Sequence, residues 1–355
     1  MILMEHVPLA PLTTLGVGGP ARYFCELNTR ADVFEAVDFA RSRQLPLFVL
    51  GGGSNLLVAD AGFPGLVVKI NLRGIKQSEL EQGWVAFEVA AGEDWDAFVA
   101  RTVDANCAGL ECLSGIPGTT GGAPVQNVGA YGQEVANCIR YVDTFALSEN
   151  TACFANYRCI LSNEQCKFGY RSSRFNSEDR GAFLILKVRF ELELGGKPTL
   201  RYPELQSYFA GRTKEPTLAE VRAAVREIRH RKAMLLVPGD VDVHSAGSFF
   251  KNPVVPKKRF EALDELARNR GLEMPNYPAD EELRKLSAAW LVEQAGFHKG
   301  YQRGAVGIST RHALAIVNRG GAKAAEIVAL ADEIKSRVLG EFGIELVLEP
   351  VFVGF

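Results

Sequence analysis

With 355 residues, the chain is too long for one ordinary hydrophobic core, so we expect two or three domains. Charged residues make up 23% and hydrophobic residues 47%, a globular balance that excludes extended disorder. A formal net charge of -2 and the lack of a long basic run argue against nucleic acid as a partner, although a local basic pocket for a phosphorylated ligand stays open.

Neither a membrane nor a secreted location is expected. No apolar run approaches the roughly 20 residues that span a bilayer, and Met1–Leu15 lacks the basic and apolar regions of a signal peptide. We therefore expect a cytoplasmic protein. The odd number of cysteines and the absence of a CxxC pair favour small buried side chains over a disulfide framework, and no metal site is predicted. The seven cysteines are Cys25, Cys107, Cys112, Cys138, Cys153, Cys159 and Cys166.

The first quarter of the chain predicts short strands alternating with one helix. Apolar residues recur on one face of a helix over 31–44, and a short apolar strand follows at 46–50. That strand runs directly into Gly51–Asn55, and another strand is expected at 66–70. This order is typical of a β-α-β unit with a glycine turn at a strand end.

The next stretch predicts a second sheet around a glycine-rich segment. We expect a strand over 84–91, a helix over 94–106 and further strands over 141–147 and 182–194. Between them, residues 113–132 are too apolar and too regularly interrupted by glycine for a disordered linker.

The last third is predicted to be mainly helical. Thr217 and Glu220 form a capping box at the start of a helix over 218–231. Beyond it we expect helices at 258–270, 281–294 and 322–339, and strands at 312–318 and 344–353. No internal repeat is present, and the pattern as a whole indicates an α+β protein with several domains.

Two glycine segments are the first functional signal. The triplet Gly51–Gly53 costs backbone entropy, but it allows close approach of a ligand and turns N–H groups toward an anion, as a pyrophosphate requires. A simple tight turn is the alternative for this segment alone. The longer segment, 114–132, is hard to explain by structure only. Together the two segments could hold a dinucleotide from both ends.

A Rossmann-type glycine turn is the competing interpretation for a third segment. Leu15–Ala21 has similar glycines, but no apolar strand precedes it, no helix follows it, and its third-glycine spacing is wrong. We therefore interpret Leu15–Ala21 as a β-turn near the start of the first domain.

The glycine segments also carry a family resemblance. VLGGGSNLLV over 49–58 and SGIPGTTGGAPVQNVGAYG over 114–132 resemble the flavin-binding segments of the UDP-N-acetylenolpyruvoylglucosamine reductases, which belong to the vanillyl-alcohol-oxidase-like (PCMH-type) flavoprotein superfamily. The resemblance covers nearly the whole chain and departs at Thr13-Thr14-Leu15, where the family usually has Asn-Thr.

The resemblance implies three domains. FAD-binding subdomain 1 covers 1–71 together with a C-terminal strand at about 341–355, FAD-binding subdomain 2 covers 72–215, and a substrate-binding domain covers 216–340. No histidine or cysteine matches a motif for covalent attachment, so FAD is expected to bind non-covalently. The residues assigned to FAD are Gly51, Gly52, Gly53, Ser54, Asn55, Ser114, Gly115, Pro117, Gly118, Thr119, Gly121, Gly122, Ala123, Gln126, Asn127, Gly129, Ala130 and Tyr131.

The implied reaction passes a hydride from NADPH through FAD to the enolpyruvyl double bond of UDP-N-acetylglucosamine enolpyruvate, during peptidoglycan precursor synthesis. Such chemistry needs a cation at the substrate carboxylate and an acid for the carbanion. By family motif, Arg171 in FGYRSS binds the carboxylate, Ser248 in AGSFFKNP donates the proton, and Glu349 in LEP assists enol formation. Without the motif they would be a surface arginine, a turn hydroxyl and an exposed strand residue.

Five further positions are assigned to the substrate by the same resemblance. Lys232, after Arg229 and Arg231, would bind the diphosphate, although a solvated charge run is the alternative. Tyr202 would close over it, as in one subclass of the family, unless it is an aromatic plug. The complete set is Tyr170, Tyr202, Lys232, Asn252 and His312, of which His312 could equally be a histidine at a strand end. A monomer is expected, with small molecules as its partners.

Two other functions would share part of this pattern. An alcohol or sugar-lactone oxidase of the same fold would share the glycine segments but would not need the motifs of Arg171, Ser248 and Glu349 together. A nucleotide-sugar sensor without turnover would not need to retain all three of these side chains.

Overall fold

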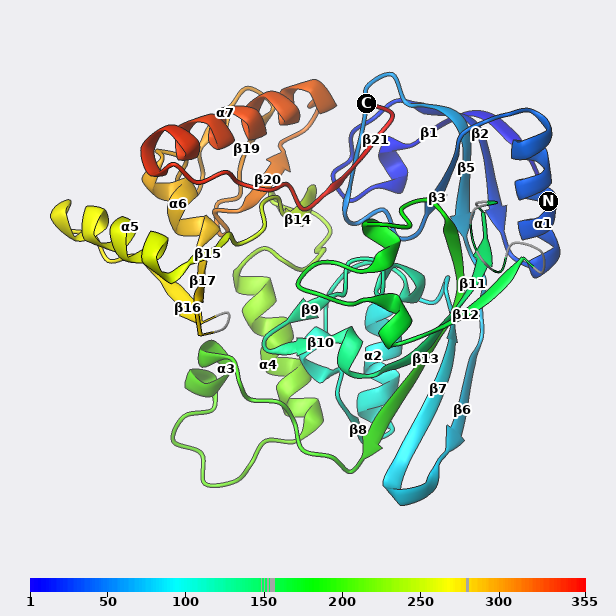
Figure 1. Ribbon diagram of the computed structural model, residues 1–355, viewed down its shortest axis with the longest axis horizontal. Helices are drawn as coiled ribbons and strands as arrows, with labels where there is room; N and C mark the ends of the chain where they lie inside the picture. The colour runs from blue at the N-terminus through cyan, green and yellow to red at the C-terminus, as the bar shows by residue number, and fades with distance from the viewer. Residues whose placement is uncertain (148, 150, 152, 154–156, 279–280) are drawn as a thin grey trace. The chain divides into compact units, whose positions relative to one another are not determined.

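The computed structural model describes residues 1–147, 149, 151, 153, 157–278 and 281–355 (Figure 1). These residues form two compact units. The first unit consists of Met1–Val7, Ala21–Gly53 and Phe63–Leu235, and the second of Pro8–Pro20, Ser54–Gly62 and Leu236–Phe355. Among the described residues, none of the helices combines the length and the apolar character needed to cross a bilayer.

The first unit begins with a four-stranded sheet in the order β1-β2-β5-β3. Its strands are β1 (Met4–Pro8), β2 (Pro20–Leu27), β3 (Leu47–Leu50) and β5 (Phe63–Ile70). β5 pairs in parallel with both β2 and β3. Helix α1 (Arg30–Ser42) connects β2 to β3 along the chain. This arrangement confirms the predicted β-α-β unit, whose glycine turn follows β3.

A larger antiparallel sheet follows in the order β12-β11-β13-β7-β6, with the short β8 (Cys107–Ala108) also paired to β13. Figure 1 shows β6, β7 and β13 side by side. The strands are β6 (Ile75–Glu79), β7 (Trp84–Ala90), β11 (Ile139–Ala146), β12 (Arg158–Ser162) and β13 (Phe183–Leu194). Helix α2 (Trp95–Asp104) packs on this sheet through an aromatic cluster of Trp95, Phe98, Phe87 and Phe190.

Two more helices complete the first unit. α3 (Pro203–Tyr208) is short, and α4 (Leu218–Arg231) has the predicted bounds. The predicted capping box is confirmed, because the Thr217 side chain accepts from the Glu220 amide and the Glu220 carboxylate accepts from the Thr217 amide. A small hairpin of β9 (Gly129–Ala130) and β10 (Gln133–Glu134) lies between β8 and β11 in the chain.

The second unit has two small sheets, a parallel strand pair and three helices. β14 (Ser245–Ser248), β20 (Ala315–Asn318), β19 (Val306–Ile308) and β18 (Gln302–Arg303) form one sheet in that order. β15 (Val254–Pro256), β17 (Leu283–Leu286) and β16 (Asn276–Pro278) form the other. β4 (Leu56–Val58) pairs with β21 (Val351–Val353), and the helices are α5 (Lys257–Asn269), α6 (Ala288–Gln294) and α7 (Ala324–Phe342).

Three predicted elements in the second unit need correction. The helix expected over 281–294 is wrong in its first half, because residues 283–286 are the central strand β17 and the helix begins only after Ser287. The Ser287 side chain accepts from the Trp290 amide at 3.2 Å and so starts α6 there. The strands expected over 312–318 and 344–353 are shorter, since β20 begins at 315 and β21 at 351.

The turn and cysteine predictions had different outcomes. The Gly16 amide donates to the Thr13 carbonyl at 3.3 Å, so the hydrogen-bonded turn covers 13–16 and includes only the start of the predicted segment Leu15–Ala21. The rest of that segment leads into β2 rather than into a helix. Five cysteines are free and buried. Cys153 and Cys159, however, form a disulfide, with Cα atoms 5.6 Å apart. Cys159 is the second residue of β12. The prediction of unpaired cysteines was wrong for this pair, because a separation of six residues along the chain does not show whether two cysteine side chains meet in the fold.

The three-domain division stays a prediction. It groups residues by the ligand they are expected to bind, whereas the two units group residues by their contacts. Helix α4, assigned to the substrate-binding domain, lies in the first unit, and the last strand lies in the second.

Candidate active site

The two glycine segments of the first unit meet backbone to backbone. A Cβ atom on Gly52 would lie 2.6 Å from the Cα of Gly118, and one on Gly51 would lie 2.9 Å from Thr119 Oγ1. Real Cβ atoms do not approach that closely, so glycine is needed at 52 for the segments to touch. The two segments therefore form one joint surface rather than separate contacts at the two ends of a ligand.

Four backbone amides on this joint surface have no acceptor within the described part of the chain. They belong to Gly52 and Gly53 from the first segment and Gly118 and Thr119 from the second. Neighbouring amides are used internally, since Thr120 N donates to Glu93 O at 2.8 Å and Gly121 N to Ala91 O at 2.9 Å. Unused N–H groups gathered on glycine backbone are typical of sites for phosphate oxygens.

Thr120 adds a polar group that sequence reasoning missed. Its side chain is fully buried, and its hydroxyl has no hydrogen-bond partner among the residues that the structure describes. Buried hydroxyls are rarely left unsatisfied, because the lost hydration costs about 1–3 kcal/mol. The position of a second threonine inside the glycine run was the available signal. A ligand with several oxygen and nitrogen acceptors, such as FAD, fits this donor set.

Charged side chains from α2 and α4 hold the second glycine segment in place. Gly115 N donates to Asp96 Oδ1 at 2.6 Å, and Arg222 donates to the same carboxylate at 2.6 Å. Burial would raise the pKa of Asp96, but the Arg222 and Gly115 hydrogen bonds prevail and lower it. Arg229, 95% removed from solvent, donates to the carbonyls of Gly115 at 3.2 Å and Met234 at 2.8 Å. Arg229 therefore supports the second glycine segment and is not part of a solvated charge run.

Several residues assigned to FAD have internal structural roles. The Ser114 hydroxyl is fully buried and donates to Glu111 O at 2.6 Å, and Ala123 lies in the hydrophobic core. Asn127 Nδ2 donates to Glu134 at 2.8 Å and to Gly169 O at 3.0 Å, while Asn127 Oδ1 accepts from Ala136 N at 3.1 Å. Asn127 thus connects the glycine segment to the loop that carries Arg171.

The loop of Arg171 is held in an unusual conformation. Arg171 has a left-handed backbone with φ of 52°, which is uncommon for a residue with a side chain and recurs at functional sites. Ser173 Oγ donates to Val125 O at 2.6 Å and ties the far side of the loop to the glycine segment. The Arg171 guanidinium lies 5.7 Å from the centre of the Tyr170 ring, and a Cβ on Gly129 would lie 3.3 Å from Arg171 Nη1. The absence of a side chain at 129 leaves room for this cation.

Three predicted ligand-binding side chains lie together near α3. The rings of Tyr131 and Tyr202 meet edge to face with centres 5.3 Å apart, and Tyr202 is the residue that precedes α3. Lys232, at the end of α4, forms an ion pair with Glu204 in the first turn of α3. Burial raises the pKa of Tyr131 to about 12, so its phenol stays protonated at neutral pH.

Ser248 and Glu349 lie on adjacent segments of the second unit. Ser248 ends β14, and its Oγ is 3.0 Å from His312 Nε2. The amide of Glu349 donates to Phe249 O at 3.0 Å. Because Phe249 is the residue after Ser248, this backbone hydrogen bond holds the segment of Glu349 beside the segment of Ser248. Asn55 Nδ2 donates to Glu349 O at 3.2 Å, which gives this predicted FAD residue a supporting role. Glu349 is half-buried and lies in an irregular segment rather than in the predicted apolar strand.

Asn252 is turned toward helix α6. Its Oδ1 accepts from the Ala288 amide at 2.9 Å. Amides in the first turn of a helix have no acceptor within that helix, so Asn252 supplies one for α6. Its Nδ2 makes no hydrogen bond to any residue in the described ranges and is the group available to a ligand. The predicted sites therefore fall into two sets. Arg171, Tyr170, Tyr202 and Lys232 lie in the first unit with most of the glycine segments, and Ser248, Glu349, Asn252, His312, Ser54 and Asn55 lie in the second.

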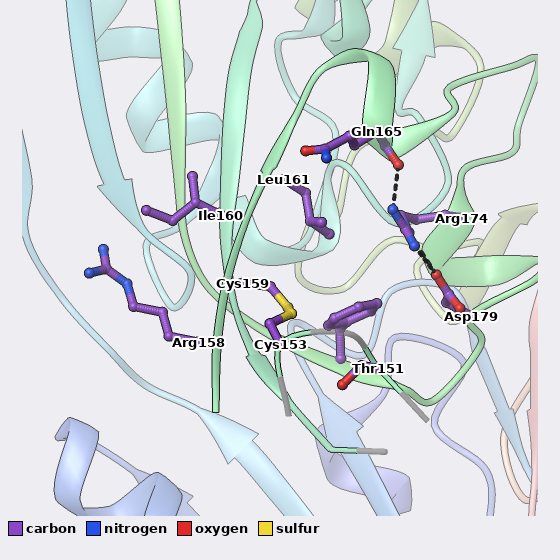
Figure 2. A pocket seen from close by; sticks show the side chains of 10 residues that line it. Thr151, Cys153, Arg158, Cys159, Ile160, Leu161, Gln165, Arg174 and Asp179 are labelled. Carbon is purple, nitrogen blue, oxygen red and sulfur yellow. Dashed lines mark hydrogen bonds and ion pairs between the residues drawn. A yellow bond between two sulfur atoms is a disulfide. The ribbon is translucent and has the colours of Figure 1, made fainter. Parts of the chain in front are cut away.

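A hollow elsewhere in the first unit contains none of the predicted site residues. Figure 2 shows the Cys153–Cys159 disulfide, Ile160 and Leu161 around it, together with Arg174. Arg174 donates to Gln165 O at 2.8 Å and to Asp179 Oδ2 at 2.7 Å. Its charge is already compensated within the protein, so this hollow does not indicate an anion site.

Known proteins match both halves of the chain. Residues 21–147 match the family described as "FAD binding domain", and residues 239–353 match "UDP-N-acetylenolpyruvoylglucosamine reductase, C-terminal domain". A UDP-N-acetylenolpyruvoylglucosamine reductase of Thermobifida fusca is 44% identical over 99% of this chain and 98% of its own length. One of Saccharopolyspora erythraea is 45% identical over 97% of this chain and 94% of its own.

A solved structure agrees with these relatives. The UDP-N-acetylenolpyruvylglucosamine reductase of Thermus caldophilus superposes with a TM-score of 0.64 at 28% identity, and it covers 99% of this chain and 100% of its own. Two curated relatives that are at least 44% identical over nearly the full length likewise cover the residues of both units. The chain belongs to the UDP-N-acetylenolpyruvoylglucosamine reductase family.

Proposed function

We propose that this chain reduces UDP-N-acetylglucosamine enolpyruvate to UDP-N-acetylmuramate, with NADPH as electron donor and non-covalent FAD as cofactor, in peptidoglycan precursor synthesis. The observation that carries the proposal is the alignment of Ser248 and Glu349 on adjacent backbone segments, inside the region that matches the reductase C-terminal domain. An oxidase that shares only the flavin-binding domain would not need this pair.

The first unit supplies the residues that would hold FAD. When bound, FAD supplies the redox chemistry by accepting a hydride from NADPH and delivering it to the enolpyruvyl double bond. The amides of Gly52, Gly53, Gly118 and Thr119 are suited to its diphosphate, and the Thr120 hydroxyl offers a further buried donor. Asp96 and Arg229 keep the second segment in this shape.

Arg171 is the proposed partner of the substrate carboxylate. A guanidinium binds a carboxylate through two parallel hydrogen bonds and keeps its charge throughout the reaction. Negative charge grows beside that carboxylate as the hydride arrives, so a cation at this point stabilises the transition state more than the ground state. Asn127 and Ser173, by tying the loop to the glycine segment, would keep the guanidinium oriented.

Ser248 is the proposed proton donor. Hydride addition at the methylene carbon leaves a carbanion, stabilised as an enolate, at the neighbouring carbon. The Ser248 O–H bond breaks as its proton moves to that carbon, and the serine oxygen is left as an alkoxide that must regain a proton before the next turnover. Glu349 would assist by hydrogen bonding to the developing enol.

Lys232 and Tyr202 are the proposed contacts of the diphosphate. Both are attached to α3, Tyr202 at its start and Lys232 through Glu204, so a movement of this short helix would carry them together. Tyr170 and Asn252 complete the proposed substrate contacts, whereas His312, which the family resemblance also assigned to the substrate, lies 3.0 Å from Ser248 Oγ. We further propose a cytoplasmic monomer that has small-molecule partners and binds neither nucleic acid nor membrane, in keeping with the formal net charge of -2.

Oxidation of NADPH tests this function directly. Purified protein should be yellow, should release FAD on denaturation, and should oxidise NADPH rapidly only when UDP-N-acetylglucosamine enolpyruvate is present. An oxidase would instead consume oxygen with an alcohol or sugar lactone, and a sensor would bind the nucleotide sugar without oxidising NADPH. A colourless protein that cannot be reconstituted with FAD would overturn the assignment.

A further inference from the structure

His312 has a defined hydrogen-bond partner in the second unit. Its Nε2 lies 3.0 Å from the Oγ of Ser248, and both side chains are partly buried. Sequence reasoning assigned His312 to the substrate or to a strand end. The geometry adds a third role, because a histidine at this distance controls where the serine hydroxyl directs its proton.

The hydroxyl of Ser309 holds the backbone around His312 in a turn. Ser309 Oγ accepts from the amides of Arg311 and His312, both at 3.1 Å. The Ala315 amide donates to the His312 carbonyl at 3.1 Å, and the Ser309 amide donates to Ala315 O at 2.8 Å. The turn 309–315 is therefore hydrogen bonded from both of its ends, and its backbone determines the position of the imidazole.

A buried carboxylate anchors this turn. Asp242 is 1% exposed, and its Oδ2 accepts from Ser309 Oγ at 2.8 Å, from Thr310 N at 3.0 Å and from Thr310 Oγ1 at 2.7 Å. Arg319 donates to the other oxygen at 2.6 Å. A buried charge with this many partners is costly to rearrange, so the turn is held rigidly. The hydrogen bonds thus run from Asp242 through Ser309 to the backbone of His312, and from its ring to Ser248.

We propose that His312 is a positioning residue for Ser248, held by Asp242 and Ser309, which orients the serine hydroxyl toward the substrate and returns a proton to it after each turnover. The proposal rests on the proposed function in its assignment of Ser248 as proton donor. With Nε2 protonated, His312 donates to the serine oxygen, and the serine proton is free to point at the carbanion. When that proton has left, the His312 Nε2–H bond breaks and its proton moves to the alkoxide, while Nδ1 takes a proton from water. The ring thus stays neutral, and the hydroxide that remains is released to solvent.

Paired substitutions at 312 test the role in turnover. His312→Leu should slow the reoxidation of reduced flavin by UDP-N-acetylglucosamine enolpyruvate by about 10–100-fold, the loss expected when a hydrogen bond to a developing charge is removed. His312→Gln should recover part of that rate, because an amide N–H can still donate to the serine oxygen. Flavin reduction by NADPH and the substrate KM should change by less than about threefold. His298→Leu, at an exposed histidine that contacts the Tyr301 ring, is the matched control and should behave as the parent protein.

The opposite pattern would overturn the proposal. A raised KM with an unchanged rate of flavin reoxidation would make His312 a substrate contact, and equal rates in the leucine and glutamine variants would exclude a hydrogen-bonding role. The readouts are the two half-reactions, followed at the flavin absorbance in a stopped-flow instrument, and the KM from steady-state turnover.

A second measurement separates this proposal from the proposed function. The ring ¹⁵N signals of His312, assigned with the His312→Gln protein, should shift between the parent protein and Ser248→Ala, because the hydrogen bond is lost without any substrate present. Unchanged signals would overturn the positioning role even if turnover were normal. If the signals shift but the enolpyruvyl substrate does not reoxidise the reduced flavin of the parent protein, the hydrogen bond between His312 and Ser248 is supported. The proposed function is then overturned instead.

Discussion

The glycine region of the first unit and the serine region of the second are built by different means. In the glycine region, 51–53 and 114–132, the backbone itself forms the surface, and Gly52 is required because two chain segments touch. In the serine region, around 242–252, 309–312 and 347–349, side chains in turns and at the end of β14 are connected by hydrogen bonds from Asp242 to Ser248. A site made of backbone leaves a visible trace in the sequence, because only glycine permits it, whereas a site made of side-chain contacts leaves almost none.

Backbone strain divides the two regions in the same way. Three residues with side chains, Asn127, Tyr131 and Arg171, have left-handed φ values of 46°, 49° and 52° in or beside the glycine region. In the serine region the left-handed position next to Ser248 is occupied by Gly247, with φ of 74°. The glycine region should therefore be sensitive to added side chains, and the serine region to the loss of donors and acceptors.

The largest effect is expected at Ser248. Ser248→Ala should leave FAD binding and flavin reduction by NADPH nearly intact and slow flavin reoxidation by substrate about 10²–10⁴-fold, the usual loss for a positioned acid. The two half-reactions, measured separately, check this expectation. Equal slowing of both would indicate general disruption, and an unchanged oxidative step would remove Ser248 as proton donor and leave Glu349 as the next candidate.

The glycine region should respond to bulk. Gly52→Val should weaken FAD binding roughly 10–100-fold, because the new side chain would meet the Gly118 backbone and separate the two segments at a cost of about 1–3 kcal/mol. Fluorescence titration of the apoprotein with FAD measures this. Gly340→Ala in α7 is the control, since its Cβ would meet nothing within 4 Å and no ligand is assigned to this position. If the two variants bind FAD equally well, close approach at Gly52 does not matter.

A smaller effect is expected at Lys232. Lys232→Ala should raise the substrate KM about tenfold, as loss of one charged contact to a diphosphate requires, with little change in flavin reduction by NADPH. Tyr202→Phe should act in the same direction but less strongly. Lys197→Ala, which removes a cation from an exposed pair with Glu215, is the control. Normal substrate affinity combined with slow flavin reduction in Lys232→Ala would contradict its proposed role.

The smallest effect concerns stability and pH in the serine region. The Arg311 hydrogen bond lowers the pKa of Asp240 below its ordinary value. The ionised form is thus favoured in the folded state, and this stabilisation is present above the unfolded pKa of about 3.9 and lost as the pH falls through the lower folded value. Asp240→Asn should lower the free energy of unfolding by about 1 kcal/mol at pH 7, and the difference should shrink below about pH 4. Urea unfolding at the two pH values measures it, and a difference independent of pH would contradict this origin.

The sequence by itself determined the features that depend on neighbours along the chain. Helix α4 was predicted with its bounds because Thr217, Glu220 and the apolar spacing are local signals. The β-α-β unit and the glycine segments were visible for the same reason, and the family motifs identified Arg171, Ser248 and Glu349 as candidates before any contact was known. These signals persist because helix capping, side-chain periodicity and glycine backbone freedom act over a few residues.

Tertiary structure alone decided the features that depend on distant partners. Residues 283–286 became a strand because β15 and β16 pair with them, against a local pattern that favoured a helix. Arg229 became a support of Gly115, 114 residues away in the chain, and Ser248 met His312 across 64 residues. The spacing of residues along the sequence does not predict these contacts. The free energy of a hydrogen bond or of packed backbone depends on interatomic distances that only the folded chain sets.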